Sequence, residues 1–317
     1  SIYRVVTRTP LVRLPLTPDV SERLAGAEIY LKLEVLQPIG SFKIRGAYNV
    51  IRQMSKDELR DGVWTVSAGN AAQGVALAAR AVGVPCSVMV MDTTPEAKLQ
   101  AIRRLGAAIV QVTYDECWKT VESHRSDRMR GQLVHPFDDD RFIAGNGTAG
   151  LEIVEDLPDV DLVVAPLGGG GLLAGIASAV HELRPQAQVF AAEPETAAPF
   201  SVSLKKGQAS YFDGWQASFV DGAGGRSVLP TMWPLLKDLL AGSIVVSLAE
   251  VTAAMKLTAE RVHVIAEGAA GCAVAGALSR RVRAEHTSRP AGPKIVAVVS
   301  GGNIDLSKFA SLVGACA

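Results

Sequence analysis

The chain carries the stretch Leu162-Val163-Val164-Ala165-Pro166-Leu167-Gly168-Gly169-Gly170-Gly171-Leu172-Leu173-Ala174. The apolar residues before the glycines predict a strand, and the small apolar residues after them, through Val180, predict a helix. A strand, a glycine turn and a helix in this order are the unit from which parallel sheets are built.

The same alternation of strand and helix recurs along the chain. Strands are predicted at residues 63–66, 87–91, 108–112, 189–192 and 294–299, and helices at residues 71–80 and 96–105. The run at 294–299 is almost continuously apolar, as in a strand that is buried on both faces. The pattern predicts an α/β fold of mostly parallel, twisted sheets with helices on both faces.

The length of 317 residues predicts two lobes. A single hydrophobic core stops growing at about 250 to 300 residues, and longer chains divide. The first series of strands and helices reads as an inserted segment that ends near residues 137–146. We therefore expect a small domain at residues 53–139 and a large domain at residues 1–52 and 140–317.

Charge and cysteine content exclude several classes of protein. Lysine plus arginine and aspartate plus glutamate number 32 each, so the composition favours neither nucleic acid nor an anionic membrane as a partner. No apolar run is long enough to span a bilayer, and no signal peptide follows Ser1, so a cytoplasmic protein is expected. The cysteines show neither CxxC nor zinc-site spacing; they are Cys86, Cys117, Cys272 and Cys316.

The glycine turn Gly168–Gly171 is typical of a phosphate cradle. Backbone N–H groups at the start of a helix point toward an anion, and glycine lets the backbone approach without a β-carbon in the way. The alternative is a flexible loop without a ligand. The spacing matches neither the Rossmann nor the Walker pattern, which disfavours a dinucleotide or a nucleoside triphosphate.

Lys43 lies in the run Gly40-Ser41-Phe42-Lys43-Ile44-Arg45-Gly46. A lysine amine becomes a nucleophile when burial or neighbouring cations help its proton to leave, and such lysines capture carbonyl compounds as Schiff bases. Phe42 and Ile44 supply apolar flanks, and Arg45 supplies a cation. The alternative is an ordinary lysine on a solvated face with a buried stem.

Two further glycine turns follow predicted strands. Ser67-Ala68-Gly69-Asn70 opens a helix and suits a carboxylate, although a well-capped helix explains it equally. Ser300-Gly301-Gly302-Asn303 follows the run at 294–299, which places Ser300 at the strand end where open α/β sheets bind ligands. Together with Lys43 and Gly168–Gly171, these turns describe pyridoxal phosphate bound for work on an amino acid.

These motifs make the chain resemble the serine/threonine dehydratases and serine racemases of the fold-type II pyridoxal-phosphate enzymes. The resemblance extends over nearly the whole length. It includes Arg8-Thr9-Pro10-Leu11, His135-Pro136-Phe137-Asp138, Ala192-Glu193-Pro194-Glu195, Asp221-Gly222 and Glu267-Gly268. It implies a two-lobed fold like that of tryptophan synthase β, with a large cofactor domain, a small domain for the substrate carboxylate, and a homodimer.

The resemblance also implies roles for individual residues. Lys43 would be the Schiff-base lysine and the base that removes the α-proton. The implied contacts to the cofactor come from Phe42, Lys43, Asn70, Gly168, Gly169, Gly170, Gly171, Glu267 and Ser300. The implied contacts to the substrate come from Ser67, Ala68, Asn70, Ala71 and Gln73.

Several positions depart from the family pattern. Ala68 replaces the serine that serves racemases on the face opposite the lysine, and Ala71 replaces a histidine usual in the dehydratases. Trp118 is expected either near the polar end of the substrate or as a hydrophobic-core residue on a helix. For the family's cation site, Glu193 and the carbonyl of Ala197 are the expected ligands, but Pro199 replaces an aspartate. The cation site is therefore expected to be weak, absent or monovalent.

The expected activity is elimination of water from a β-hydroxy amino acid, giving a 2-oxo acid and ammonia. The substrate is expected to resemble threonine or serine, or to be bulkier or similar to 3-hydroxyaspartate. The alternatives are an amino-acid racemase of the serine racemase type and a non-catalytic protein that binds pyridoxal phosphate. The resemblance also implies that the Ser300 hydroxyl is the partner of the pyridine nitrogen of the cofactor. A neutral hydroxyl makes the cofactor ring a weaker electron sink than an aspartate would, which favours elimination.

Overall fold

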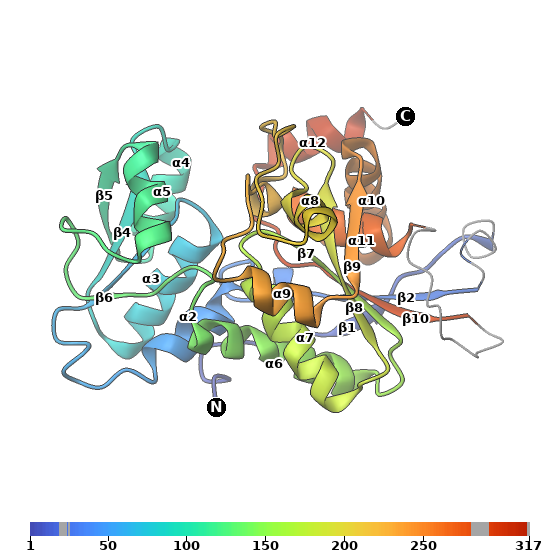
Figure 1. Cartoon of the computed structure of the whole chain (residues 1–317), viewed down its shortest axis with the longest axis horizontal. Helices are drawn as coiled ribbons and strands as arrows, with labels where there is room; N and C mark the ends of the chain where they lie inside the picture. Colours follow the sequence, from blue (N-terminus) through green and yellow to red (C-terminus); the bar gives the residue numbers. More distant parts are fainter. Residues whose placement is uncertain (19–23, 25, 280–291, 316–317) are drawn as a thin grey trace. The chain divides into compact units, whose positions relative to one another are not determined.

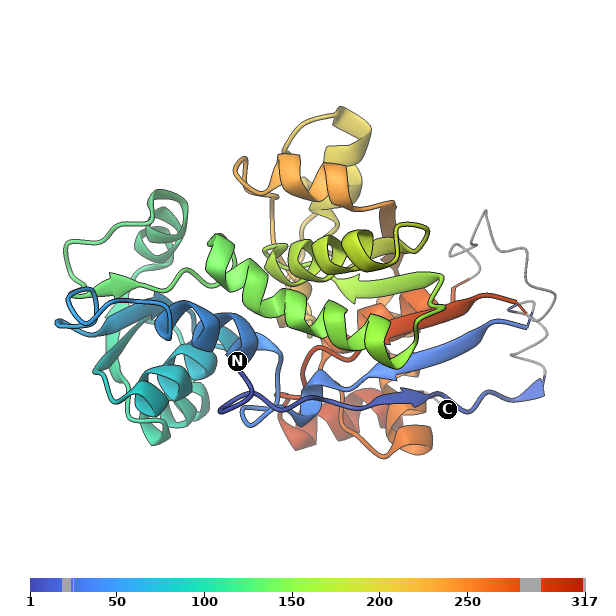
Figure 2. The ribbon, with the colours of Figure 1, turned by 90° about the horizontal axis from the view of Figure 1, so that it is seen from below.

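The computed structural model describes residues 1–18, 24, 26–279 and 292–315. The chain forms two compact units, drawn in two views in Figures 1 and 2. Unit 1 contains Ser1–Arg8 and Gln37–Asn146, and unit 2 contains Thr9–Leu36 and Gly147–Ala317. Among the described residues, no helix is both long and apolar enough to cross a membrane.

Unit 1 contains a four-stranded sheet in the order β5-β4-β3-β6, and its strands are all parallel. The strands are β3 (Val63–Val66), β4 (Cys86–Met91), β5 (Ala108–Val112) and β6 (Gln132–Leu133). The helices are α2 (Lys43–Ile51), α3 (Asn70–Val82), α4 (Glu96–Arg104), α5 (Tyr114–Ser123) and the first turns of α6 (Asp140–Asp156).

The core of unit 1 lies between α2, α3 and the sheet. Alanines dominate the buried face of α3, and their small side chains let α3 pack closely on both neighbours. The buried residues of this core include Ile44, Ala47, Ile51, Ala72, Val75, Ala76, Val88, Val90 and Phe142. Gly83 ends α3 in the left-handed conformation, with φ of 82°, which glycine adopts without strain.

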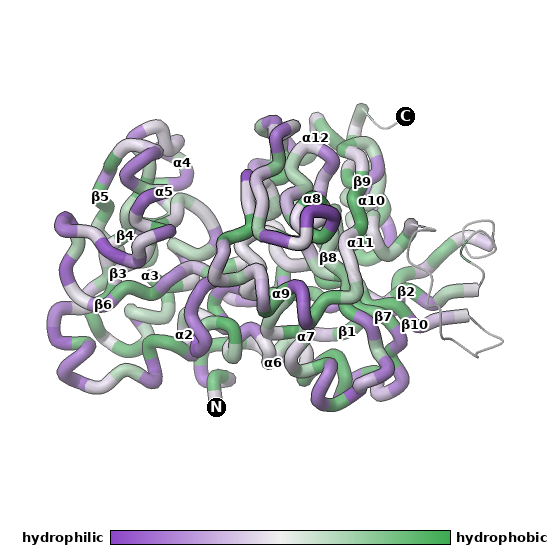
Figure 3. Tube along the Cα trace, in the orientation of Figure 1, coloured by the Kyte–Doolittle hydropathy of each residue, from purple (hydrophilic) through white to green (hydrophobic). Residues whose placement is uncertain are grey.

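Unit 2 contains a six-stranded sheet in the order β1-β2-β10-β7-β8-β9. The strands are β1 (Leu11–Arg13), β2 (Glu28–Lys32), β7 (Leu162–Pro166), β8 (Gln188–Pro194), β9 (Gly242–Val246) and β10 (Lys294–Val298). Only β1 at the edge is antiparallel to its neighbour. The almost continuous apolar sequence of β7, green in Figure 3, is typical of a strand that is covered on both faces.

The helices of unit 2 differ in burial. They are the second part of α6, α7 (Gly171–Leu183), α8 (Pro199–Lys206), α9 (Trp233–Leu239), α10 (Leu248–Val262), α11 (Gly268–Ala277) and α12 (Leu306–Gly314), with short 3₁₀ turns η1 (Glu34–Leu36) and η2 (Asp221–Ala223). Every residue of α11 is buried, and α11 packs against β7, β8 and β10. Small residues around the whole circumference of α11 make this central position possible.

The predicted fold class is confirmed, and each predicted strand and helix is present within a few residues of its expected bounds. The two compact units are bounded differently from the predicted domains 53–139 and 1–52 with 140–317. The chain from Gln37, including α2, belongs to unit 1, because Ile44 and Ile51 pack into the same core as α3. Lys43 therefore shares a unit with the turn Ser67–Asn70.

Candidate active site

Lys43 is the first residue of α2, and its side chain is held within unit 1. The Lys43 Nζ donates a hydrogen bond of 2.6 Å to the backbone oxygen of Pro136. The ring of Phe42 lies with its centroid 5.1 Å from this Nζ, and the ring of Phe142 lies 5.4 Å away. The amine therefore combines one neutral oxygen acceptor with two aromatic neighbours, of which the sequence indicated only Phe42.

The backbone of Lys43 is fixed by close packing against α3. A β-carbon placed on Gly74 would lie 3.0 Å from the carbonyl carbon of Lys43 and 3.2 Å from its Cβ. Gly74 lies one helical turn after Asn70, and Ala71 and Gln73 lie in the turn between them. Unit 1 therefore places the predicted lysine on α2, which packs directly against α3, the helix that the predicted substrate turn opens.

No side chain caps the N-terminus of α3. Gly69 is the N-cap residue, and the Ser67 Oγ accepts the Gly69 N–H at 3.1 Å instead of a helical N–H group. The space where a β-carbon of Gly69 would point is open for at least 4 Å. Ser67, Ala68, Gly69 and Asn70 are all half-buried. A capped helix, the alternative explanation of this turn, is therefore wrong, and the helix start remains suited to an anion.

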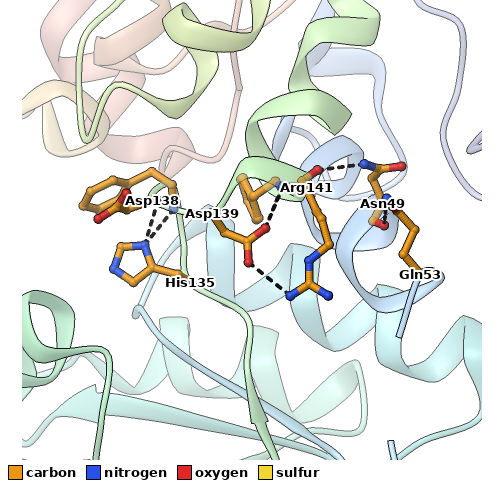
Figure 4. Close-up of polar contacts among 8 residues, drawn as sticks. Asn49, Gln53, His135, Asp138, Asp139 and Arg141 are labelled. Carbon is orange, nitrogen blue, oxygen red and sulfur yellow. Dashed lines mark hydrogen bonds and ion pairs between the residues drawn. The ribbon is translucent and has the colours of Figure 1, made fainter. Parts of the chain in front are cut away.

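His135 organises the segment that carries the Pro136 oxygen. Its Nδ1 accepts the N–H groups of Asp138 at 2.7 Å and Phe137 at 3.4 Å, as Figure 4 shows for Asp138. Its Nε2 lies 3.1 Å from the backbone oxygen of Val121 on α5. Burial, with a smaller contribution from the neighbouring His124, lowers the pKa of His135 to about 4. His135 is therefore a neutral ring that links a turn to a helix.

The same segment is anchored to α2 beyond Asp138. The Asp139 Oδ1 accepts the N–H groups of Arg141 at 2.8 Å and Phe142 at 3.0 Å, which caps the start of α6. The Asn49 Nδ2 donates to the backbone oxygen of Arg141 at 2.7 Å (Figure 4). Since Lys43 and Asn49 both lie on α2, this helix binds the segment at two points.

In unit 2, the loop from Gly168 to Gly171 leaves no room for a β-carbon at Gly168 or Gly170. Gly170 has φ of 93°, and a β-carbon on it would lie 2.7 Å from the Leu236 Cδ1. A β-carbon on Gly168 would collide with the backbone oxygen of Gly222. Gly170 is the N-cap of α7 and no side chain caps this helix. The loop therefore presents backbone groups alone at a helix start, as a phosphate cradle requires.

Ser300 and Glu267 lie beside this loop in unit 2. The parallel register of β10 with β7 pairs Ile295 with Leu162, so the residues after both strands meet at the same edge of the sheet. Ser300 is buried there, with 2% of its surface exposed. The Glu267 N–H donates to the backbone oxygen of Gly301 at 3.0 Å. Unit 2 therefore brings together the predicted glycine loop, Ser300 and Glu267.

The geometry around Glu193 does not resemble an open cation site. Its carboxylate accepts the N–H groups of Phe200 at 2.8 Å and Ser201 at 2.9 Å, and the Ser243 hydroxyl at 2.5 Å. Desolvation raises the pKa of the Glu193 carboxyl, and these bonds oppose that shift. Glu193 thus caps α8, which starts at Pro199. The described residues contain no group of three histidine, cysteine or acidic side chains that could hold a metal ion.

The cysteines of the described chain are buried thiols. Burial raises the pKa of Cys86 to about 12 and that of Cys117 to about 11, and it also raises the pKa of Cys272. Cys316 lies outside the described residues. A thiolate nucleophile is therefore not available at these three positions. Trp118, on α5, is half-buried, which leaves both explanations of its role open.

Comparison with known proteins gives the same picture over nearly the whole chain. The family model described as "Pyridoxal-phosphate dependent enzyme" matches residues 2–301. The chain is 36% identical to the L-threonine ammonia-lyase of Thermotoga maritima, over 99% of this chain and 75% of that protein. It is 37% identical to the serine racemase of Homo sapiens, over 92% of this chain and 86% of that protein.

Solved structures resemble the chain in fold as well. The processed form of threonine deaminase isoform 2 from Solanum lycopersicum superposes with a TM-score of 0.86 at 33% identity, covering 99% of this chain and 89% of that one. Maize serine racemase superposes with a TM-score of 0.87 at 30% identity, covering 98% and 92% of the two chains. Dehydratases and racemases are thus matched about equally well.

Proposed function

Because the chain belongs to the pyridoxal-phosphate dependent enzymes, and within them to the threonine dehydratase and serine racemase group, we propose that it is an ammonia-lyase. The proposed substrate is a β-hydroxy amino acid, which loses water and then ammonia to give a 2-oxo acid. The observation that carries this choice is Ala68, which offers a methyl group where a racemase needs a second proton carrier.

The residues of each unit fit the cofactor. The Gly168–Gly171 loop is a cradle of backbone groups, and neighbouring atoms exclude a β-carbon at Gly168 and Gly170. Lys43 offers a primary amine beside a neutral oxygen acceptor, and Ser300 a buried hydroxyl. Bound there, pyridoxal phosphate supplies an electron sink for the charge that develops at the α-carbon of the substrate.

The proposal assigns a role to each of these residues. Lys43 would hold the cofactor through its Nζ until the substrate amine takes its place there, and the freed Lys43 amine would then accept the α-proton of the substrate. The Gly168–Gly171 loop and α7 hold the phosphate, and Asn70 and Ser300 hold the ring. The start of α3 holds the substrate carboxylate, with Ser67 and Gln73 beside it. With Ala68 opposite, Lys43 is the only proton carrier that we assign.

A panel of β-hydroxy amino acids tests the proposal. L-threonine, L-serine, 3-hydroxyaspartate and a β-phenyl analogue should be compared by release of 2-oxo acid and of ammonia in equal amounts. Ala71 leaves room where the dehydratases usually have a histidine. We therefore expect the fastest product release from a compound larger than serine. Lys43→Ala should abolish turnover and Lys43→Arg, which keeps the charge, should not restore it. Release of neither product from any compound would contradict the proposal.

Racemisation is the second candidate, supported by the similarity to human serine racemase. Chiral analysis of unreacted amino acid after partial turnover separates the two activities. We expect no inversion in the native protein, and measurable inversion in Ala68→Ser, which restores a hydroxyl to that turn. A native protein that inverts its substrate faster than it releases ammonia would be a racemase. Release of more than one product molecule per protein chain would show turnover. It would exclude the alternative that the protein binds the cofactor without catalysis.

A further inference from the structure

The Pro136 carbonyl oxygen must be held in position to accept the hydrogen bond from the Lys43 Nζ. It belongs to a connecting segment between β6 and α6, separated from Lys43 by 93 residues of sequence. The Pro136 carbonyl shares a planar peptide group with the N–H of Phe137, so the group that holds this N–H also sets the direction of the carbonyl. The Phe137 N–H donates to the His135 Nδ1 at 3.4 Å. Neighbouring groups must fix the direction of this carbonyl.

The ring of His135 is the group next to Pro136 that fixes the segment on both sides. Its Nδ1 closes a turn by accepting the Asp138 N–H at 2.7 Å (Figure 4). Because Nδ1 is an acceptor, the ring proton must lie on Nε2, where it donates to the Val121 oxygen at 3.1 Å. One tautomer of the neutral ring therefore satisfies both contacts, and a doubly protonated ring would break the first.

The ring of His135 is buried and stacked, and its hydrogen bonds to backbone set its orientation. Only 3% of the His135 surface is exposed. The ring of His124 stacks on it with centroids 4.3 Å apart, and the ring of Phe137 meets it edge-on at 4.7 Å. His124 itself is held by the Asp138 carboxylate at 3.2 Å. A neutral, buried and stacked imidazole with both nitrogens bonded to backbone is suited to a scaffold and not to proton transfer.

We propose that His135 is a positioning residue for Lys43: it fixes the Pro136 carbonyl oxygen so that this oxygen holds the Lys43 Nζ. The inference rests on the proposed function only in giving Lys43 a proton to move. An amine that has just taken the α-proton is a cation, and a cation donates a stronger hydrogen bond to a carbonyl than a neutral amine does. The Pro136 carbonyl thus stabilises the protonated Lys43 amine and fixes the direction of the Nζ.

Three variants form a graded test. His135→Asn can still accept the Asp138 N–H but cannot reach Val121, and His135→Ala keeps neither contact. His124→Asn is the matched control, since it removes the stacked ring but leaves both His135 contacts, and asparagine tolerates the φ of 58° found at this position. The measurements are the rate at which apoprotein captures pyridoxal phosphate, and kcat per bound cofactor counted after borohydride reduction.

We expect His135→Asn to lower kcat per bound cofactor about tenfold to a hundredfold, as a misplaced reacting group does. His135→Ala should lower it further, the capture rate should fall in the same order, and KM should change little. His124→Asn should match the native protein in both measurements. If His135→Asn instead lowered only the unfolding temperature and the cofactor content, at unchanged kcat per cofactor and capture rate, the ring would be merely structural and the inference wrong.

Two measurements keep the inference testable if the variants do not fold or the native protein shows no lyase activity. Nitrogen NMR of the native protein should show His135 protonated on Nε2 alone at neutral pH, and a proton on Nδ1 would overturn the assignment. The capture rate is measured without any amino acid. An inactive native protein whose capture rate still depends on His135 would therefore refute the proposed function while supporting this inference.

Discussion

Gly74 on α3 lies so close to Lys43 on α2 that a β-carbon on Gly74 would lie 3.0 Å from the Lys43 carbonyl carbon and 3.1 Å from its oxygen. The nearest atoms belong to backbone, so no side-chain rotation can relieve the contact. The depth of Lys43 in unit 1 is therefore set by the missing side chain of a residue on the neighbouring helix.

Gly74→Ala should lower both stability and the rate of cofactor capture. Alanine favours a helix by up to about 1 kcal/mol over glycine, but overpacking costs about 1–3 kcal/mol, so we expect a net loss of about 1 kcal/mol in the free energy of unfolding by urea. Gly314→Ala, on α12 with open space around it, is the control and should change little. Equal stability of the two variants would contradict the packing argument.

The stability of the protein should fall in acid partly because of His135. Its pKa is lowered in the folded state to about 4 from an ordinary value of 6.5. The unfolded chain therefore binds a proton at a higher pH than the folded protein does. The contribution is complete above pH 6.5, is lost as the pH falls toward 4, and amounts to about 3 kcal/mol. Urea unfolding of the native protein and of His135→Asn, compared between pH 7 and 4, should give a steeper decline for the native protein, and parallel curves would refute the assignment.

Glu193→Gln should destabilise unit 2 without any involvement of a cation. The amide of glutamine would point a donor at an N–H group or hydroxyl that now donates to the carboxylate. An unsatisfied buried group costs about 1–3 kcal/mol. Glu182→Gln, the same change at an exposed position on α7, is the control. Chelators and added Mg²⁺ or Ca²⁺ should leave the unfolding temperature of the native protein unchanged; a large rise with either ion would contradict this prediction and indicate a divalent-cation site.

Breaking the ion pair between Lys32 and Glu152 should destabilise the protein more than replacing both residues with apolar ones. The Lys32 Nζ lies 2.6 Å from the Glu152 Oε2, both side chains are fully buried, and the Nζ also donates to the Thr9 oxygen at 2.7 Å. Glu152→Gln should cost about 3 kcal/mol, because it removes the nearer acidic partner of a buried charge and leaves the Asp156 carboxylate at 4.0 Å. Lys32→Met combined with Glu152→Leu should cost less than that single change, and a double variant at least as unstable would contradict the prediction.

The sequence predicts the fold well because its signals are local. The hydrophobic patterns and the positions of the glycine turns are enough to find β3, β7 and α7. The parallel arrangement of the strands follows from the alternation of strands and helices along the chain. The strands β1, β2, β6 and β9 were not predicted.

The site is predicted less completely because its contacts are distant in sequence. Lys43 is flagged by its flanks, but its acceptor Pro136 is 93 residues away. The run His135-Pro136-Phe137-Asp138 stands out in the sequence as a motif, yet nothing in it says that the ring bonds Val121 or that the carbonyl turns toward a lysine. The contacts of Glu193 are also distant in sequence, since its donors come from α8 and from Ser243 on β9.

The order of strands in unit 2 also governs how the protein can form on the ribosome. The chain makes β2 first among the parallel strands, but β2 pairs with β10, and β10 separates it from β7. Unit 1 is complete once Asn146 has been synthesised, whereas the large sheet lacks a central strand until Lys294–Val298 emerges. Domains generally fold as units in the order of their synthesis, so the nascent chain carries a finished unit 1 together with two strand edges, on β2 and β7, that stay unpaired until the last strand arrives.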